Sequence, residues 1–135
     1  MICSEIVQQY ESRFGRIDVY DRYLVSTLNS EAGRDPNRLE YLHWILAITE
    51  EHFCEPWGFI GNRVNANAAD PALLARARKT VPLWRSFAVV GYTSRTRELF
   101  ELESLVLNGF PHCYFEALEC AEAWTDTVIR SVRSQ

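Results

Sequence analysis

The sequence predicts one α/β domain that spans residues 1–135, with a single mixed sheet of five strands and four helices. Short runs of β-branched and aromatic residues near the start predict a hairpin. Strand-like apolar runs then alternate with helical patterns, which implies parallel strands joined by right-handed crossovers. A chain of 135 residues has the commonest length for one domain, and its 47% of hydrophobic residues can form a core.

Local signals place these elements in order along the chain. The hairpin is expected around Asp21 and Arg22, which separate two runs rich in β-branched and aromatic residues. Two helices are expected to begin where an aspartate N-cap is followed by proline, at Asp35 and at Asp70. The expected order is a strand at 13–20, a strand at 23–28, a helix from 36 to about 53, a strand at 57–64 and a helix from 71 to about 79. The glycines in the strand at 57–64 are interpreted as allowing close packing.

The second half of the chain continues the alternation. Residues 86–92 form an apolar run typical of a central strand that is buried on both faces. Thr93 or Ser94 caps the next helix, which is expected to reach about residue 107 and to stop at Asn108 and Gly109. A strand at 112–115 precedes the last helix. That helix carries apolar residues at three- to four-residue spacing, namely Leu118, Ala121, Trp124 and Val128.

Charge is unevenly distributed along the chain. The net charge is −4, which disfavours a nucleic-acid partner. Residues 71–97 nevertheless carry six basic and no acidic side chains, whereas residues 1–70 carry six basic and 11 acidic ones. The middle segment is therefore locally basic in an acidic protein.

The sequence predicts a cytoplasmic protein without integral membrane association. Its first residues lack the basic and long apolar segments of a signal peptide, and no apolar run approaches the roughly 18 residues of a membrane span. The cysteines fit a reducing compartment as free, buried or unreactive thiols. They are Cys3, Cys54, Cys113 and Cys120, of which the last two are interpreted as core residues.

No residue cluster has the spacing of a catalytic or metal site, so no catalytic residue, metal or cofactor is assigned. His43 and His52 lie nine positions apart, about 180° around one helix, and cannot share a ligand. The cysteines form no CxxC pair, and the sequence contains no Gly-x-Ser-x-Gly, P-loop or GxGxxG pattern. An enzyme is therefore less favoured than a protein-interaction domain or a protein that binds a small molecule.

The second half of the chain resembles the C-terminal half of STAS domains, the fold of bacterial anti-sigma-factor antagonists. The residues that carry the resemblance are 87–90 (Phe-Ala-Val-Val), 97–102 (Arg-Glu-Leu-Phe-Glu-Leu), 110–115 and 121–124 (Ala-Glu-Ala-Trp). In the family, an apolar strand leads through a loop to such a helix, then to a short strand and a final helix. The last helix looks most like that of the uncharacterised bacterial STAS/SEC14-like proteins. The resemblance implies a fold rather than a function.

The chain departs from the signalling members of that family at one position. Those proteins are switched by phosphorylation of a Ser or Thr between the third strand and the next helix. Residues 62–79 contain no Ser, Thr or Tyr at all, and the next hydroxyl belongs to Thr80. A STAS relative with this sequence is therefore expected to lack the usual phosphorylation switch.

The loop after the strand predicted at 86–92 is a candidate anion site. Exposed amides at a helix start, with hydroxyl and guanidinium groups, favour an anion, and ligands gather at the carboxyl ends of strands in open α/β sheets. The alternative is a capped helix with an exposed charged face, on which Arg97 pairs with Glu101. The candidate residues are Thr93, Ser94, Arg95 and Arg97.

The first predicted helix carries more apolar surface than one sheet face requires. Its two stripes, which begin about 90° apart, are Leu39, Leu42, Leu46 and Phe53, and Tyr41, Trp44, Ile45 and Ile48. Either a neighbouring helix of the chain or a partner covers the second stripe. Because Tyr and Trp are enriched at interface hot spots, Tyr41, Trp44 and Ile48 are candidate contacts of a homodimer or of another protein partner.

Two functions follow from these features. The first is a non-catalytic domain for protein–protein interaction or regulation. The alternative is a protein that binds a small anionic or lipid-like molecule near residues 92–97. An interaction module needs an exposed apolar patch, whereas a ligand binder needs an enclosed pocket with converging polar groups.

Overall fold

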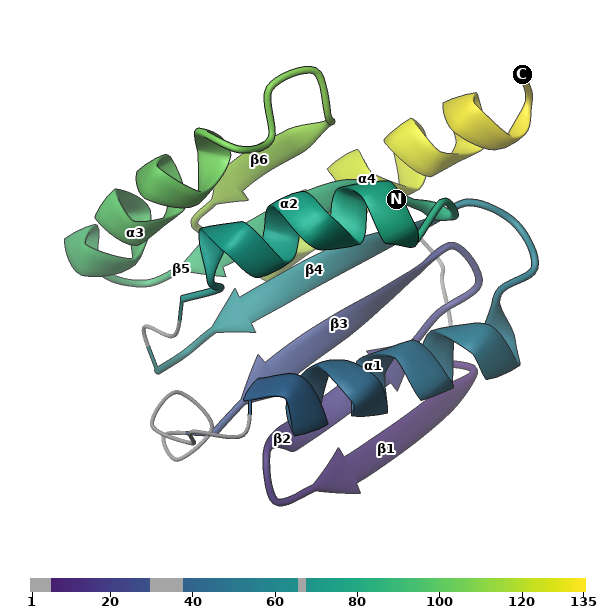
Figure 1. The fold of residues 1–135 in the computed structure, drawn as a ribbon, viewed down its shortest axis with the longest axis horizontal. Coiled ribbons are helices and arrows are strands. Elements are labelled where there is room, and N and C mark those ends of the chain that lie inside the picture. Colours follow the sequence, from purple (N-terminus) through teal and green to yellow (C-terminus); the bar gives the residue numbers. More distant parts are fainter. Residues whose placement is uncertain (1–5, 30–37, 66–67) are drawn as a thin grey trace.

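The computed structural model describes residues 6–29, 38–65 and 68–135, which form an α/β fold (Figure 1). Its strands are β1 (Gln8–Ser12), β2 (Gly15–Val19), β3 (Tyr23–Leu28), β4 (Trp57–Arg63), β5 (Trp84–Gly91) and β6 (His112–Phe115). Its helices are α1 (Arg38–His52), α2 (Pro71–Thr80), α3 (Ser94–Ser104) and α4 (Leu118–Arg133). The predicted α/β class, with a mixed sheet and four helices in the described part of the chain, is confirmed.

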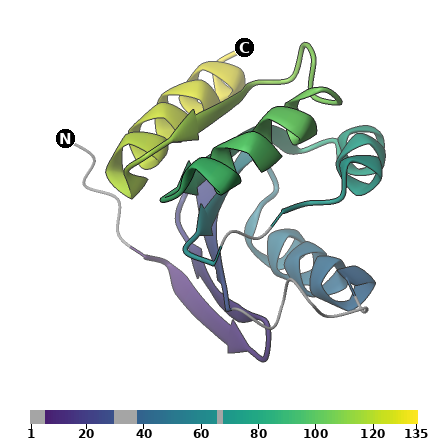
Figure 2. The ribbon, with the colours of Figure 1, turned by 90° about the vertical axis from the view of Figure 1, so that its left-hand side faces the viewer.

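The strands form one sheet, in which they follow the order of the chain from β1 to β6. β1, β2 and β3 are antiparallel, and β3 to β6 are parallel. Right-handed crossovers between strands that advance in one direction put their helices on one face. Figure 2 shows α1, α2 and α3 on that face and α4 on the other. The carboxyl ends of the parallel strands therefore meet at one edge of the sheet.

The described residues form six strands rather than the five predicted, because β1 precedes the predicted hairpin. The first predicted strand, at 13–20, begins in a turn. Residues 13 and 14 connect β1 to β2, and Ser12 Oγ accepts a hydrogen bond from the Phe14 amide at 3.1 Å. Gly15 follows with a φ of 138°, and a Cβ there would collide with the carbonyl oxygen of Thr27. The sequence pattern does not indicate β1 as a strand, because Tyr10 is its only apolar residue. Pairing with β2, rather than its own sequence pattern, makes it an edge strand.

The helices begin at the predicted caps wherever the structure describes them. Asp70 Oδ1 accepts a hydrogen bond from the Ala72 amide at 2.9 Å, and Thr93 Oγ1 accepts one from the Thr96 amide at 3.2 Å. The cap predicted at Asp35 lies outside the described residues. α3 ends at residue 104, earlier than predicted, because the next three amides each bond to the carbonyl three residues back and tighten the chain into turns.

The core lies on both faces of the sheet. On the face of α1, α2 and α3 it includes Ile17, Leu24, Ile48, Trp57, Phe87 and Phe100. On the face of α4 it consists of Tyr23, Val25, Ile60, Ala88, Val90 and Ala121. Because successive strand residues point to opposite faces, the central strands β3, β4 and β5 contribute to both clusters.

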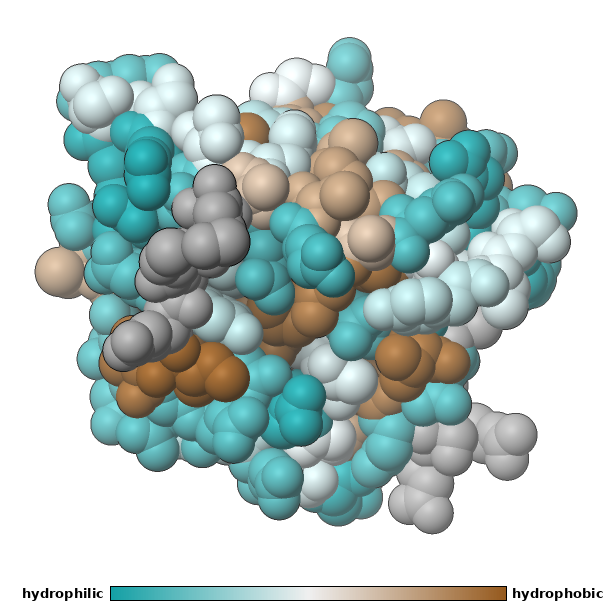
Figure 3. Space-filling model, turned by 180° about the vertical axis from the view of Figure 1, so that it is seen from behind, coloured by the Kyte–Doolittle hydropathy of each residue, from teal (hydrophilic) through white to brown (hydrophobic). Residues whose placement is uncertain are grey.

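Viewed from the side of α4, the molecule shows apolar areas surrounded by hydrophilic side chains (Figure 3). Across residues 6–29, 38–65 and 68–135, none of the helices combines the length and apolarity that crossing a lipid bilayer requires.

The cysteines are less buried than predicted. Cys120 is exposed, so its assignment to the core is wrong. α4 buries the side that carries Ala121 and Thr125, and Cys120 lies on the outer side of the helix. Cys54 is also exposed and Cys113 is half-buried, whereas Cys3 lies outside the described residues.

Candidate ligand-binding cavity

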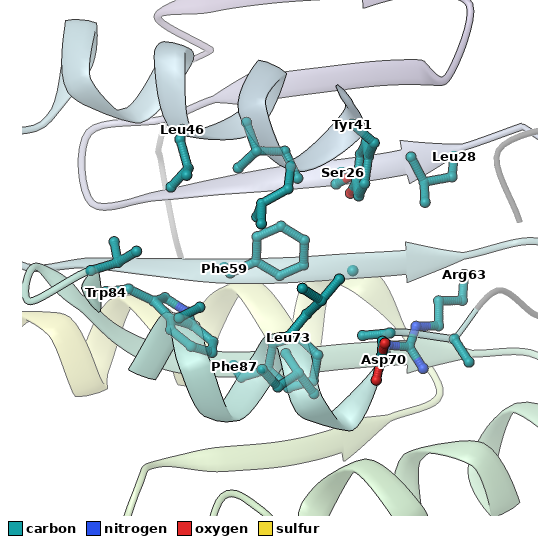
Figure 4. Close-up of a pocket in the computed structure, with 18 of the residues that line it drawn as sticks. Ser26, Leu28, Tyr41, Leu46, Phe59, Arg63, Asp70, Leu73, Trp84 and Phe87 are labelled. Carbon is teal, nitrogen blue, oxygen red and sulfur yellow. The ribbon is translucent and has the colours of Figure 1, made fainter. Parts of the chain in front are cut away.

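A cavity of about 160 Å³ opens between α1 and α2, above the middle of the sheet. Figure 4 shows its floor at Phe59 of β4, with Leu46 reaching in from α1 and Leu73 from α2. A second hollow, of about 210 Å³, adjoins it between the same two helices. The two share Leu42, Leu46 and Leu73, and the second also includes the exposed Leu39.

The cavity exists because α1 and α2 each pack on a different part of the sheet. α1 packs against the β1–β2 hairpin, where the ring centroids of Tyr41 and Trp44 lie 5.7 and 6.1 Å from that of Phe14. α2 buries Leu74 on the other side. The cavity lies between these two contacts.

Gly61 leaves the floor of the cavity open. A Cβ at this position would lie 3.5 Å from Phe59 Cε1 and 3.8 Å from Arg63 Nε, which are ordinary van der Waals distances. The other glycines of the central strands differ. A Cβ at Gly58 would collide with the Thr125 methyl, and one at Gly91 with the Tyr114 hydroxyl. Close packing therefore explains Gly58 and Gly91, whereas a Cβ at Gly61 would make only ordinary contacts.

Aromatic side chains line much of the cavity. Phe59 and Phe87 stack with their ring centroids 5.7 Å apart, and Trp84 meets Phe87 edge to face at 6.0 Å. The indole Nε1 of Trp84 donates a hydrogen bond to the Ser86 carbonyl at 2.8 Å, so its polar group is already satisfied. These rings present an apolar surface to an occupant.

Polar side chains gather at one end of the cavity, which we call the polar end: Ser26, Tyr41, Arg63 and Asp70. Figure 4 places them toward the carboxyl ends of β3 and β4, with Trp84 toward the opposite end. Ligand sites in open α/β sheets favour this edge. The anion site predicted from the sequence would lie at this same edge, but at the end of β5, whereas the polar end of the cavity lies at the ends of β3 and β4.

The hydroxyl groups of Ser26 and Tyr41 form a hydrogen bond of 2.8 Å at the polar end. Burial raises the pKa of the Tyr41 phenol to about 12, although the bond to Ser26 and the charge of Arg63 act in the opposite direction. The phenol is therefore neutral at physiological pH, and the pair carries no charge.

Arg63 is held by Glu103 of α3 in a buried, bidentate ion pair. Nη1 donates to Oε2 at 2.7 Å and Nη2 to Oε1 at 2.6 Å, and the two side chains are only 8% and 2% exposed. Glu103 Oε2 also accepts a hydrogen bond from the Ala69 amide at 3.3 Å, just before α2 begins. The guanidinium charge is thus neutralised within the protein.

The predicted anion-site residues lie outside the cavity. Thr93, Ser94, Arg95 and Arg97 are all exposed at the start of α3. Arg95 approaches Glu98 at 3.8 Å, and the guanidinium of Arg97 lies 4.9 Å from the centroid of the Tyr114 ring. Arg97 therefore stacks on the Tyr114 ring. The alternative interpretation of the sequence paired it with Glu101 instead. An anion site in this loop stays a prediction.

The predicted interface residues face the protein's own core. Ile48 is 3% exposed, and Tyr41 and Trp44 are partly buried against the hairpin. On the other stripe of α1, Leu39 is exposed, and Leu42 and Leu46 are half-buried like Tyr41 and Trp44. A protein contact through Tyr41, Trp44 and Ile48 stays a prediction, and Ile48 has almost no surface to offer it.

Comparison with protein family models, with curated proteins and with solved structures finds no match to this chain. The described residues contain no group of three or more His, Cys, Asp or Glu side chains that could hold a metal ion. The cavity is therefore the feature from which a function can be argued.

Proposed function

We propose that this protein is a non-catalytic domain that binds a small, largely apolar molecule in the cavity between α1 and α2. The observation that carries the proposal is the arrangement of the cavity, with apolar and aromatic walls and a few polar groups gathered at one end. Binding sites for small molecules have this composition, because apolar walls supply affinity and the polar groups fix orientation.

The energetics of the cavity support an occupant. The hollow of about 160 Å³ opens to solvent, so its apolar and aromatic walls are exposed to water when it holds no ligand. A ligand that fills the hollow removes this apolar surface from water, which contributes about 25 cal/mol per Å². The half-buried leucines at its mouth, Leu42, Leu46 and Leu73, would gain contacts in the same step.

Methyl NMR with toluene as the ligand tests this proposal. Titration should shift the methyl signals of Leu42, Leu46 and Leu73, and the affinity should be millimolar or better. Leu105, which follows α3, lies outside the cavity lining and is 76% exposed, is the control. Its signals should not shift. If the cavity leucines stay unchanged at saturating toluene, or shift no more than Leu105, the protein does not bind apolar molecules there.

A STAS-like fold is part of the proposal. Its support is that the residues that carry the resemblance occupy β5, α3, β6 and α4 in the expected order of strand, helix, strand and helix. The absence of hydroxyl side chains from 62–79 supports a domain that works without the phosphorylation switch.

A role in protein–protein interaction is the second candidate. The observation that favours it is the exposed apolar surface at the end of α3, where Leu102 is 58% and Leu105 is 76% exposed. Sedimentation velocity should detect a dimer that Leu105→Ser dissociates without unfolding the monomer. A wild-type protein that stays monomeric at high concentration removes the homodimer from consideration.

A further inference from the structure

We infer that the polar end of the cavity selects a neutral ring compound with one hydrogen-bonding group, such as an aromatic alcohol, over anions and cations. This inference rests on the proposed function and names the class of ligand. It replaces the anionic ligand that the sequence suggests with an uncharged one.

The hydroxyl pair at the polar end provides the hydrogen-bonding partner. Ser26 Oγ and Tyr41 Oη are 2.8 Å apart, and either of them can donate to the other. Two hydroxyl groups hold two hydrogens, and one is used within the pair. One O–H hydrogen and several lone pairs remain for a ligand, which matches a single alcohol, phenol or carbonyl group.

The charges at the polar end disfavour an anion. Among the described residues that line the cavity, Arg63 is the one cation at this end, and both of its terminal nitrogens are bonded to the carboxylate of Glu103. The start of α2 would also attract an anion, but the carboxylate of Asp70 already caps it. These three side chains sum to a net charge of −1.

A cation is disfavoured for a different reason. Among the described residues at the polar end, Glu103 is paired with Arg63, and Asp70 accepts the Ala72 amide through Oδ1. An ammonium group would therefore lose its hydration in a largely apolar hollow and would compete with the Ala72 amide for the Asp70 carboxylate.

The size and lining of the cavity indicate a ring. A volume of about 160 Å³ resembles that of an engineered apolar cavity of roughly 150 Å³ that accommodates benzene. Phe59, Phe87 and Trp84 offer ring faces and edges on the side away from the polar end. An aromatic ring that lies against them would point its substituent toward Tyr41 and Ser26.

Three isosteric probes and an apolar reference test the inference: benzyl alcohol, benzoate, benzylamine and toluene at pH 7. Dissociation constants come from the same methyl NMR titration. Benzyl alcohol should bind at least tenfold more tightly than benzoate and benzylamine. If benzoate or benzylamine binds as tightly as the alcohol while toluene also binds, the selectivity is wrong and the binding function stands. If none of the four binds, both proposals are wrong.

The variant Tyr41→Phe tests the role of the hydroxyl pair. Loss of one neutral hydrogen bond should weaken benzyl alcohol by about 3- to 10-fold and leave toluene within about twofold of its wild-type affinity. Tyr10→Phe is the matched control and should change neither ligand, because Tyr10 lies on β1 outside the cavity lining and its hydroxyl is bonded to His52. Equal changes for benzyl alcohol and toluene in Tyr41→Phe would show that the hydroxyl does not contact the ligand and would overturn the inference.

Discussion

Arg63 and Glu103 form a bidentate ion pair inside the protein, with both N–O distances below 2.8 Å. The pair joins the end of β4 to α3, and Glu103 also fixes the Ala69 amide that leads into α2. One glutamate therefore neutralises the arginine of the cavity and positions the helix that forms one cavity wall.

The first prediction is that Glu103→Gln destabilises the protein by about 3–5 kcal/mol, because it leaves a buried guanidinium without its counter-charge. The double variant Arg63→Met/Glu103→Leu should recover most of this loss, since it removes both charges. Glu98→Gln is the control. It interrupts the exposed pair with Arg95 and should cost less than about 1 kcal/mol. Urea unfolding measures all four proteins, and a double variant no more stable than Glu103→Gln would contradict the coupling.

The second prediction concerns stability at high pH. The Tyr41 phenol has a pKa of about 12 in the folded protein, against about 10 in the unfolded chain. Between these values the unfolded state loses its proton first, so stability is fully present below about pH 10 and is lost as the pH rises to about 12. Two pH units correspond to about 2.7 kcal/mol. Tyr41→Phe should lose less stability than wild type from pH 9 to 11.5, and parallel curves would contradict the assignment.

The third prediction is that alanine substitution changes stability in opposite directions at different glycines of the central strands. Gly58→Ala and Gly91→Ala force a methyl group against Thr125 and Tyr114 and should destabilise the protein by about 1–3 kcal/mol. Gly61→Ala adds a methyl group that makes only ordinary van der Waals contacts, and it should stabilise by about 0.4–1 kcal/mol because it restricts the unfolded chain. Thermal unfolding of the three variants checks the order. A destabilised Gly61→Ala would show that the floor of the cavity is closed.

The fourth prediction is that Glu122→Gln stabilises the protein at pH 7 by a few tenths of a kcal/mol, after allowance for solvent screening. Burial raises the pKa of Glu122, nearby Glu119 and Asp18 add to the effect, and the hydrogen bond from Tyr23 opposes it. The stability that the protonated carboxyl contributes is complete below its unfolded pKa and is lost as the pH rises through the folded pKa. The advantage of Gln should therefore vanish below about pH 4. Equal stability of the two proteins at pH 7 would contradict it.

The elements with strong local signals could be predicted from the sequence. Asp70 followed by proline marks the start of α2, and Thr93 marks that of α3, because a cap is a contact between near neighbours. β1 could not be predicted in this way. Its polar sequence becomes a strand only by pairing with β2, and that pairing depends on the turn at Gly15.

The candidate site was harder to predict than the fold. Its polar end combines Ser26 of β3, Tyr41 of α1 and Arg63 of β4, and only the folded sheet brings these three together. The sequence did contain one signal, the glycines in the strand at 57–64. Close packing is the correct explanation for Gly58 and the wrong one for Gly61, and the difference depends on what each glycine faces.

The face of α1 that meets the core also depended on tertiary structure. Both apolar stripes of the helix satisfy the same periodicity, so the sequence could not decide between them. Phe14, at the turn of the hairpin, decides it by packing against Tyr41 and Trp44. Leu42 and Leu46 are left to line the cavity.

Filling the cavity from its floor tests the binding function most directly. Gly61→Val places a β-branched side chain, which suits a strand, into the space above Phe59. Leu73→Trp fills the same space from α2 and serves as a second variant that leaves β4 unchanged. Toluene affinity is measured for both by methyl NMR, alongside thermal unfolding to establish that each variant is folded. The cavity account predicts that both fold and bind toluene at least tenfold more weakly than wild type. Folded variants that bind toluene as tightly as wild type would contradict it.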